Sequence, residues 1–144
     1  MGKPAAAIIC LGNRYVAGDD VGCRVFECLK NMPRQDEVEL IDGGLCGLDL
    51  LSLLEGRARV VFADALTGVT DPDRVVVLGR TEVAAQANRY GHSAGLPFLL
   101  GMMPRVVPPP WPAVAVVGAA AGADERTVLA VAERCMGIAS RGDA

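Results

Sequence analysis

Short apolar runs alternate with longer segments of helical spacing along this chain. Residues 5–11 contain no polar position, which predicts a first strand that is buried on both faces. Val21, Val25 and Leu29 then recur at four-residue spacing, which predicts one face of a helix. Pro33 ends this helix, because proline disfavours the helical conformation in the residue before it.

Three more apolar runs follow at strand length. Residues 38–41 predict a short second strand that stops at the turn Asp42-Gly43-Gly44, and residues 45–54 predict a second helix. Residues 59–63 predict a third strand, and residues 74–78 a fourth. The segment between these last two strands is shorter than the dozen or so residues that a parallel crossover needs. We therefore expect the fourth strand to be antiparallel and to lie at an edge of the sheet.

The last third of the chain predicts two helices and a final strand. A helical turn around residues 82–86 precedes His92, and a helix starting near Ser93 would bury one apolar side made of Leu96, Leu99, Leu100 and Met103. Residues 104–112 hold five prolines and predict an extended connection. Residues 113–117 predict the last strand, and Asp124 or Thr127 would start the terminal helix.

Together these elements predict an α/β fold in which residues 1–144 form a single three-layer domain. We expect about five strands in a mostly parallel twisted sheet, with one antiparallel edge strand and helices on both faces. A length of 144 residues and a hydrophobic content of 51% fit one domain with a substantial core.

Composition excludes several classes of function. The net charge is −3 and the 14 basic residues are scattered, so the chain has no basic stripe for nucleic acid. No apolar run reaches the roughly 20 residues of a membrane span, and no cleavable secretory signal is visible. The five cysteines form no C-x-x-C pair, which favours reduced thiols in a cytoplasmic protein. We expect a monomer that binds neither nucleic acid nor membrane.

Acidic residues follow each of the first three predicted strands. These residues are Asp19 and Asp20, Asp42, and Asp64. If the strands are parallel, the acids gather at the carboxyl edge of the sheet, where open α/β sheets bind ligands. Two simpler interpretations stay open: Asp19 or Asp20 caps the helix, and Asp42 only makes a turn. Asp64 follows an apolar strand, where a carboxylate needs a partner to offset its desolvation.

His92 is the single histidine of the chain. One imidazole with two or three carboxylates suits an open site for a divalent transition metal, although a lone histidine is also a common surface residue. No dinucleotide or Walker fingerprint is present, so we expect no nucleotide. No G-x-S-x-G elbow occurs either, and Cys10 and Cys46 are by default buried, inert thiols.

Four motifs in a fixed order resemble those of the hydrogenase maturation proteases. Gly12-Asn13 with Asp19 and Gly22 looks like the family's G-N-x5-D/E-x-x-G element. Asp42-Gly43-Gly44 with Gly47 and Leu50-Leu51 is similar to its D-G-G-x-x-G-x-x-L-L element. Asp64-Ala65 resembles its D-A strand end, and His92 with Gly95-Leu96 its H-x-x-G-L segment.

The resemblance implies an aspartyl-type endopeptidase that activates a hydrogenase. Its substrate would be the nickel-loaded precursor of a [NiFe] hydrogenase large subunit, from which it removes a short C-terminal extension. Asp19, Asp64 and His92 would contact nickel and carry catalysis, with Asp20 as the alternative to Asp19. The nickel would be carried by the substrate and not bound permanently by the protease. Asp42, Gly43 and Gly44 would recognise the substrate.

Two other functions stay open from the residues alone. One is a non-catalytic flavodoxin-like module that holds a metal, or that docks on a hydrogenase-like partner without cutting it. The other is a small α/β protein whose carboxyl-edge acids only cap helices.

Overall fold

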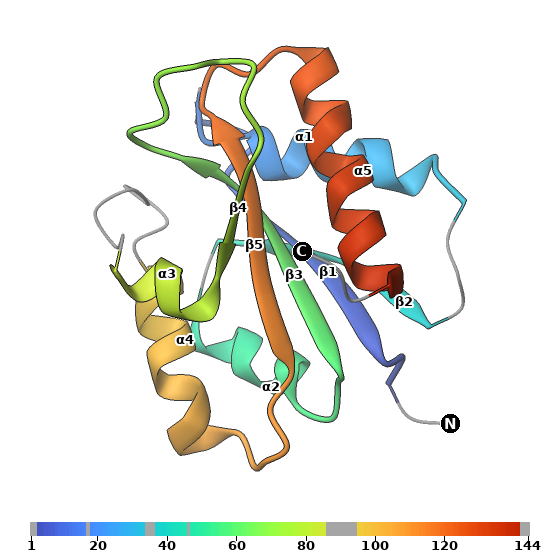
Figure 1. Cartoon of the computed structure of the whole chain (residues 1–144), viewed down its shortest axis with the longest axis vertical. Helices are drawn as coiled ribbons and strands as arrows, with labels where there is room; N and C mark the ends of the chain where they lie inside the picture. The colour runs from blue at the N-terminus through green and yellow to red at the C-terminus, as the bar shows by residue number, and fades with distance from the viewer. Residues whose placement is uncertain (1–2, 17, 34–36, 46, 86–94, 142–144) are drawn as a thin grey trace.

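A computed structural model describes residues 3–16, 18–33, 37–45, 47–85 and 95–141. They form a five-stranded sheet in the order β2-β1-β3-β5-β4. The strands are β1 (Ala6–Leu11), β2 (Val38–Gly44), β3 (Arg59–Leu66), β4 (Val76–Gly79) and β5 (Ala113–Ala120). All neighbouring pairs are parallel except β4 with β5, which are antiparallel at one edge (Figure 1). The predicted fold class is confirmed, including the direction of the fourth strand.

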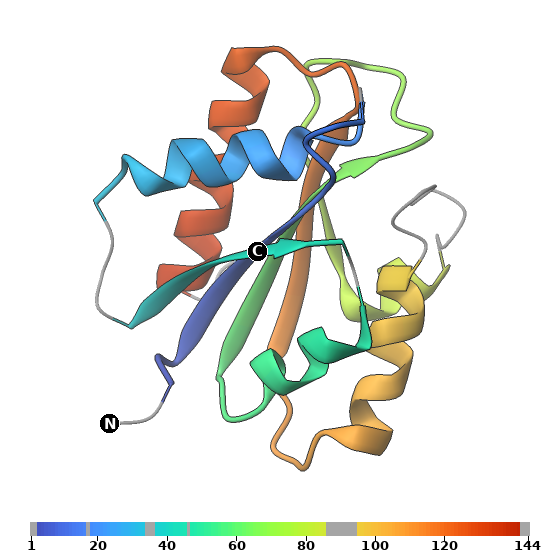
Figure 2. The same ribbon diagram turned by 180° about the vertical axis from the view of Figure 1, so that it is seen from behind.

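Helices cover both faces of this sheet (Figures 1 and 2). On one face lie α1 (Val21–Lys30) and α5 (Glu125–Arg141). On the other lie the 3-10 turn η1 (Leu48–Leu50), α2 (Leu51–Leu54), α3 (Arg80–Ala85) and α4 (Gly95–Val106). None of the helices in the described ranges is both long enough and apolar enough to span a bilayer. That residues 1–144 form a single domain stays a prediction.

Alternation along the strands gives each face its own core. Ile8, Val61 and Val117 belong to the cluster under α1 and α5. Their neighbours Ile9, Phe62 and Val116 belong to the cluster under α2, α3 and α4. Successive strand side chains point to opposite faces, so the apolar runs read from the sequence fill two cores at once.

The predicted helical faces are the buried ones. Val21, Val25 and Leu29 of α1 are fully buried, and Lys30 ends that helix just before Asn31 and Pro33. In α4 the four predicted core residues are at most 3% exposed: Leu96, Leu99, Leu100 and Met103. Asp124 starts α5 as expected, because its Oδ1 accepts the Thr127 N–H at 2.9 Å.

Several predicted boundaries were wrong. The second strand does not stop before Asp42 but continues to Gly44, with a bulge where Cys10 and Leu11 of β1 pair with Asp42 and Gly44. The strands β3 and β5 both run three residues further than expected, because they pair with each other as far as Leu66 and Ala120.

Two helices also differ from their predicted extent. The second helix is shorter than expected, since its first part is the 3-10 turn η1 and only Leu51–Leu54 is α-helical. Helix α4 continues past Pro104 to Val106, where an extended connection was expected. Pro104 lies in the last turn, so it removes a single intrahelical hydrogen bond there.

Candidate functional site

The N-terminus of α1 lies directly on the backbone at the carboxyl end of the sheet. A Cβ atom on Gly22 would stand 1.8 Å from the Leu11 carbonyl oxygen and 2.9 Å from that of Ala63. Only glycine allows this approach. Helix α1 therefore begins over the ends of β1 and β3, and it brings the segment of Asp19 and Asp20 to the same edge as Asp64.

Asp19 and Asp20 are half-buried at the start of this helix. The Asn13 N–H donates to the Asp19 carbonyl oxygen at 2.8 Å, which folds the loop back onto the end of β1. Asp20 occupies the N-cap position, but its carboxylate accepts no capping hydrogen bond. The capping interpretation is thus wrong for the Asp20 side chain, and both carboxylates lie at a helix end whose dipole attracts negative charge.

Asp64 is the one acidic residue that is fully buried in the described part of the chain, with 0% exposure. Its Oδ1 accepts the N–H of Ala65 at 2.8 Å. By strand alternation its side chain lies on the face of Phe62 and Leu66, which α4 covers. A buried carboxylate is costly unless polar groups compensate it, and the Ala65 N–H is one such group.

Asp42 bridges the first loop and the second strand. Its Oδ2 lies 3.2 Å from Nη2 of Arg14, and its Oδ1 accepts the Gly44 N–H at 3.2 Å. The Gly12 N–H in turn donates to the Gly44 carbonyl oxygen at 2.8 Å. The interpretation that Asp42 only makes a turn is therefore wrong: Asp42 lies within β2, and its carboxylate ties the first loop to the end of that strand.

Gly43 is the residue that the bulge leaves without a partner on β1. A Cβ there would stand 2.7 Å from Cγ2 of Ile9, so a side chain would push β2 away from β1. Gly44 has a φ of +58°, which glycine adopts without strain. The D-G-G turn is therefore required by the packing as well as by any role in recognition.

The structure assigns Arg14 a contact that sequence reasoning missed. Its partner Asp42 is 28 positions away and belongs to another strand. Such a pair has no periodic signal in the sequence, because it depends on the tertiary register of β1 and β2.

His92 lies outside the described residues, as do Ser93 and Cys46. Within the described ranges, no three histidine, cysteine or acidic side chains gather closely enough to hold a metal ion. The ligand set of Asp19, Asp64 and His92, with Asp20 as alternative, therefore stays a prediction. Helix α4 starts at Gly95, so His92 precedes the helix that covers the Asp64 side of the sheet.

Three of the described thiols are disfavoured as nucleophiles by their surroundings. Burial raises the pKa of Cys10 well above its usual range, and it raises the pKa of Cys135 to about 12. Cys23 lies beside Gly12, and burial is the main cause that raises its pKa as well. The reactive species of cysteine is the thiolate, and a raised pKa lowers the thiolate fraction of each of these three residues.

Comparison with known proteins gives a consistent result. The family model for hydrogenase maturation proteases matches residues 23–121. The hydrogenase 2 maturation protease of Escherichia coli is 30% identical over 102 residues, which are 67% of this chain and 61% of that protein. The chain thus aligns with about three fifths of the length of that relative.

Solved structures extend the similarity over most of the chain. The hydrogenase-maturating endopeptidase HybD from E. coli is 25% identical with a TM-score of 0.72, over 92% of this chain and 87% of that one. The [NiFe] hydrogenase maturation protease HybD from Thermococcus kodakarensis has a TM-score of 0.65 over 96% of this chain and 99% of that one. Its identity is 17%, so it bears on the fold alone.

Proposed function

Because this chain belongs to the hydrogenase maturation protease family, we propose that it is an endopeptidase of hydrogenase maturation. Its substrate is the nickel-loaded precursor of a [NiFe] hydrogenase large subunit. It removes a short C-terminal extension from that precursor and so completes the maturation of the subunit.

One observation carries this proposal. The backbone contact of Gly22 with Leu11 and Ala63 brings the Asp19 and Asp20 segment to the sheet edge where the Asp64 carboxylate is buried. An open set of oxygen ligands suits a metal that arrives bound to another protein. Nickel on the precursor polarises the scissile carbonyl or lowers the pKa of a water molecule.

Asp19, Asp64 and His92 are the residues proposed to contact the nickel and to carry catalysis. Asp19 is favoured over Asp20 because it stands at the acidic position of the family's G-N-x5-D/E-x-x-G element. Asp42, Gly43 and Gly44 are proposed to recognise the substrate. They are joined to the Asp19 loop by the Arg14 ion pair and the Gly12 hydrogen bond.

The test is cleavage of nickel-loaded and nickel-free large-subunit precursor, followed by intact-mass measurement. We expect loss of the C-terminal peptide from the nickel-loaded form alone. Cleavage of both forms at equal rates would contradict nickel sensing. Tight binding of the precursor without any cleavage would favour the non-catalytic docking module.

His92→Ala supplies the matched variant. It should abolish nickel-dependent cleavage and leave the circular dichroism spectrum and the melting temperature unchanged. A His92→Ala protein that cleaves at the wild-type rate would remove the imidazole from the mechanism. Sedimentation of the free protein tests the expected monomer in the same preparation.

A further inference from the structure

A surface groove separates η1 and α2 from the C-terminal half of α4. Its volume is about 460 Å³. Its apolar lining comes from both sides, with Leu48 and Leu51 on one and Met102 and Val106 on the other. Leu48 is 54% and Val106 is 56% exposed, although both are large apolar side chains. The groove therefore presents apolar surface that the fold itself does not cover.

Carboxylates border this apolar surface. Asp49 and Glu55 are exposed members of the lining, and no lysine or arginine is among the lining residues. The ion pairs found within the described ranges involve neither of them. Lys3 donates from Nζ to the carbonyl oxygens of Ser52 and Glu55, so its charge partly offsets the two carboxylates and the margin of the groove stays net negative. The charge of the groove fits a partner that is apolar with basic margins.

We propose that the groove docks a segment of the hydrogenase large-subunit precursor that carries apolar side chains flanked by lysine or arginine. This inference rests on the proposed function and adds a binding surface away from the reacting peptide bond. Apolar side chains that fill such a groove supply most of the affinity, and charges at the rim direct association.

The groove follows the proposed recognition segment, residues 42–44, along the chain, because Leu48 comes four positions after Gly44. Figure 2 shows α2 beneath the end of β2 and beside α4. A precursor held in the groove is therefore bound on the α2 and α4 side of the sheet, by a surface separate from the acids at the carboxyl edge. Docking of this kind raises the local concentration of the scissile segment.

A pair of double variants tests the groove. In Leu48→Asp with Val106→Asp, two exposed apolar side chains become charged, so folding is not at risk. We expect the KM for nickel-loaded precursor to rise by about tenfold or more and kcat to stay within about twofold. Leu129→Asp on α5 is the matched control, because Leu129 is also exposed, at 43%, but lies on the opposite face of the sheet.

The second variant reverses the charge. Asp49→Lys with Glu55→Lys should also raise KM, and it should weaken the dependence of precursor affinity on salt, since rim charges are screened by salt. Glu133→Lys, an exposed position on α5, is its control. An unchanged KM and an unchanged precursor affinity in both groove variants would overturn the proposal. A wild-type dimer that Leu48→Asp with Val106→Asp dissociates would overturn it too, because the occupant would be a second copy.

The two proposals fail separately. A wild-type protein that binds the precursor but does not cleave it contradicts the endopeptidase function. A loss of precursor affinity in the groove variants of that same protein would still support the docking surface. Cleavage that is equally efficient in the wild type and in both groove variants would overturn the docking surface and leave the endopeptidase function in place.

Discussion

The two helical layers of this molecule differ in how they meet the sheet and in what they show to solvent. The layer of α1 and α5 reaches the strand backbone itself, because Gly22 puts no side chain between α1 and the carbonyl oxygens of Leu11 and Ala63. The layer of α2, α3 and α4 packs on the sheet through side chains, including Phe62 and Leu66.

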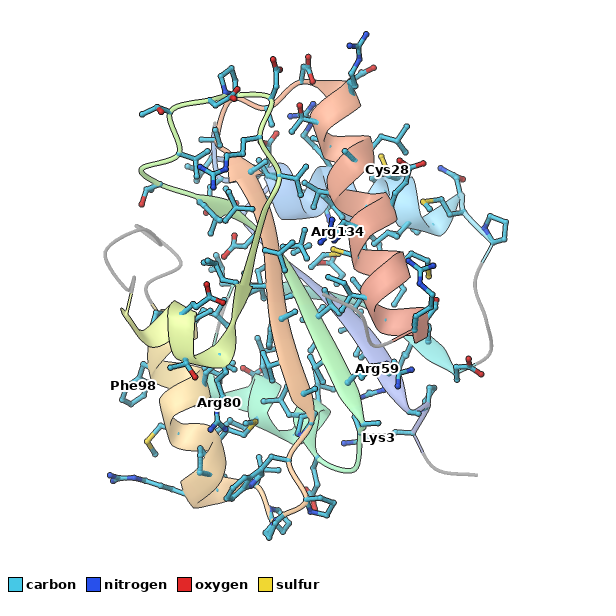
Figure 3. All side chains as sticks on the ribbon, in the orientation of Figure 1. Lys3, Cys28, Arg59, Arg80, Phe98 and Arg134 are labelled. Atoms are coloured by element: carbon cyan, nitrogen blue, oxygen red, sulfur yellow. The ribbon has the colours of Figure 1, made fainter. Side chains whose placement is uncertain are left out.

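Their outer surfaces differ in the same way. Among the well-exposed large apolar side chains of the described residues, Leu129 is the one that belongs to α1 or α5. The other layer exposes Leu48, Phe98 and Val106, and Figure 3 shows Phe98 on the outer side of α4. The first layer thus sets the geometry of the candidate site, and the second offers surface for a partner.

The largest expected effect is that of Gly22→Ala. Its new methyl group would collide with the Leu11 and Ala63 carbonyl oxygens, which belong to central strands that cannot shift cheaply. We expect the free energy of unfolding to fall by about 3 kcal/mol or more. Urea denaturation measures this change.

Gly101→Ala in α4 is the matched control, because no atom lies within 4 Å of the position a Cβ would take. It should stabilise the protein by about 0.5–1 kcal/mol through helix propensity. An equal loss of unfolding free energy in the two variants would show that the two layers pack alike, and it would contradict the difference described above.

The next largest effect distinguishes the roles of Asp19 and Asp20, the two neighbouring carboxylates at the start of α1. Asp19→Asn should lower kcat/KM for nickel-loaded precursor by about 100-fold or more, which is the scale expected when a group close to a metal is changed. Asp20→Asn should stay within about threefold, because Asp20 is outside the proposed set of nickel contacts and its side chain makes no capping bond whose loss would disturb α1. A large loss of kcat/KM in Asp20→Asn alone would make Asp20 the residue that contacts nickel, in place of Asp19.

A smaller effect concerns Arg57, whose side chain anchors the end of α2 at the amino end of the sheet. The guanidinium of Arg57 is nearly inaccessible to solvent and is bound by Glu39 at 2.7 Å and by the carbonyl oxygens of Leu53 and Pro4. Arg57→Met should lower the free energy of unfolding by about 2 kcal/mol, because the buried guanidinium donates to all three of these partly buried acceptors and methionine donates to none.

The comparison for that anchor is the exposed pair of Lys30 and Glu27 on α1. Glu27→Gln should change the free energy of unfolding by less than about 0.5 kcal/mol, as surface ion pairs generally do. Thermal unfolding of both variants at equal ionic strength measures the difference. A similar loss in each would mean that burial adds nothing to the Arg57 contact.

The smallest effect is a pH dependence at the start of α5. The N–H of Thr127 holds the pKa of Asp124 below its usual value of 3.8. The unfolded chain therefore takes up this proton first as the pH falls, so the stabilisation is complete above 3.8 and is lost on acidification through the folded pKa. In Asp124→Asn the melting temperature should fall less steeply on acidification than in the wild type, and it should be nearly unchanged at neutral pH.

Much of this architecture follows from local patterns. The antiparallel β4 follows from a connection too short for a crossover, and the buried side of α4 follows from helical spacing. The ends of β2, β3 and β5 could not be predicted, because glycine and alanine have weak strand propensity and gain their pairing from the neighbouring strand. Gly118 illustrates this, since a Cβ there would stand 2.5 Å from the Asp64 carbonyl oxygen.

The candidate site was predictable in part for a related reason. Its acids follow strands, so their shared edge follows from parallel topology alone. The complete burial of Asp64 and the ion pair of Arg14 with Asp42 depend on how strands and loops pack in three dimensions. The burial of a carboxylate in particular contradicts the general rule for acidic residues, so it becomes visible only once the fold is known.

The hydrogen bond from Asn13 to the Asp19 carbonyl closes the first loop at its base. Tyr15 lies at its tip and is 90% exposed. The base of this loop is fixed by β1 and α1, and Arg14 beside its tip is held by Asp42. For protein engineering this makes the position beside Tyr15 an insertion point, where doubling the loop length costs only about 0.6 kcal/mol of closure entropy. A fluorescent or affinity tag placed there must leave Arg14 in place, so that the link to the Asp42 carboxylate is kept.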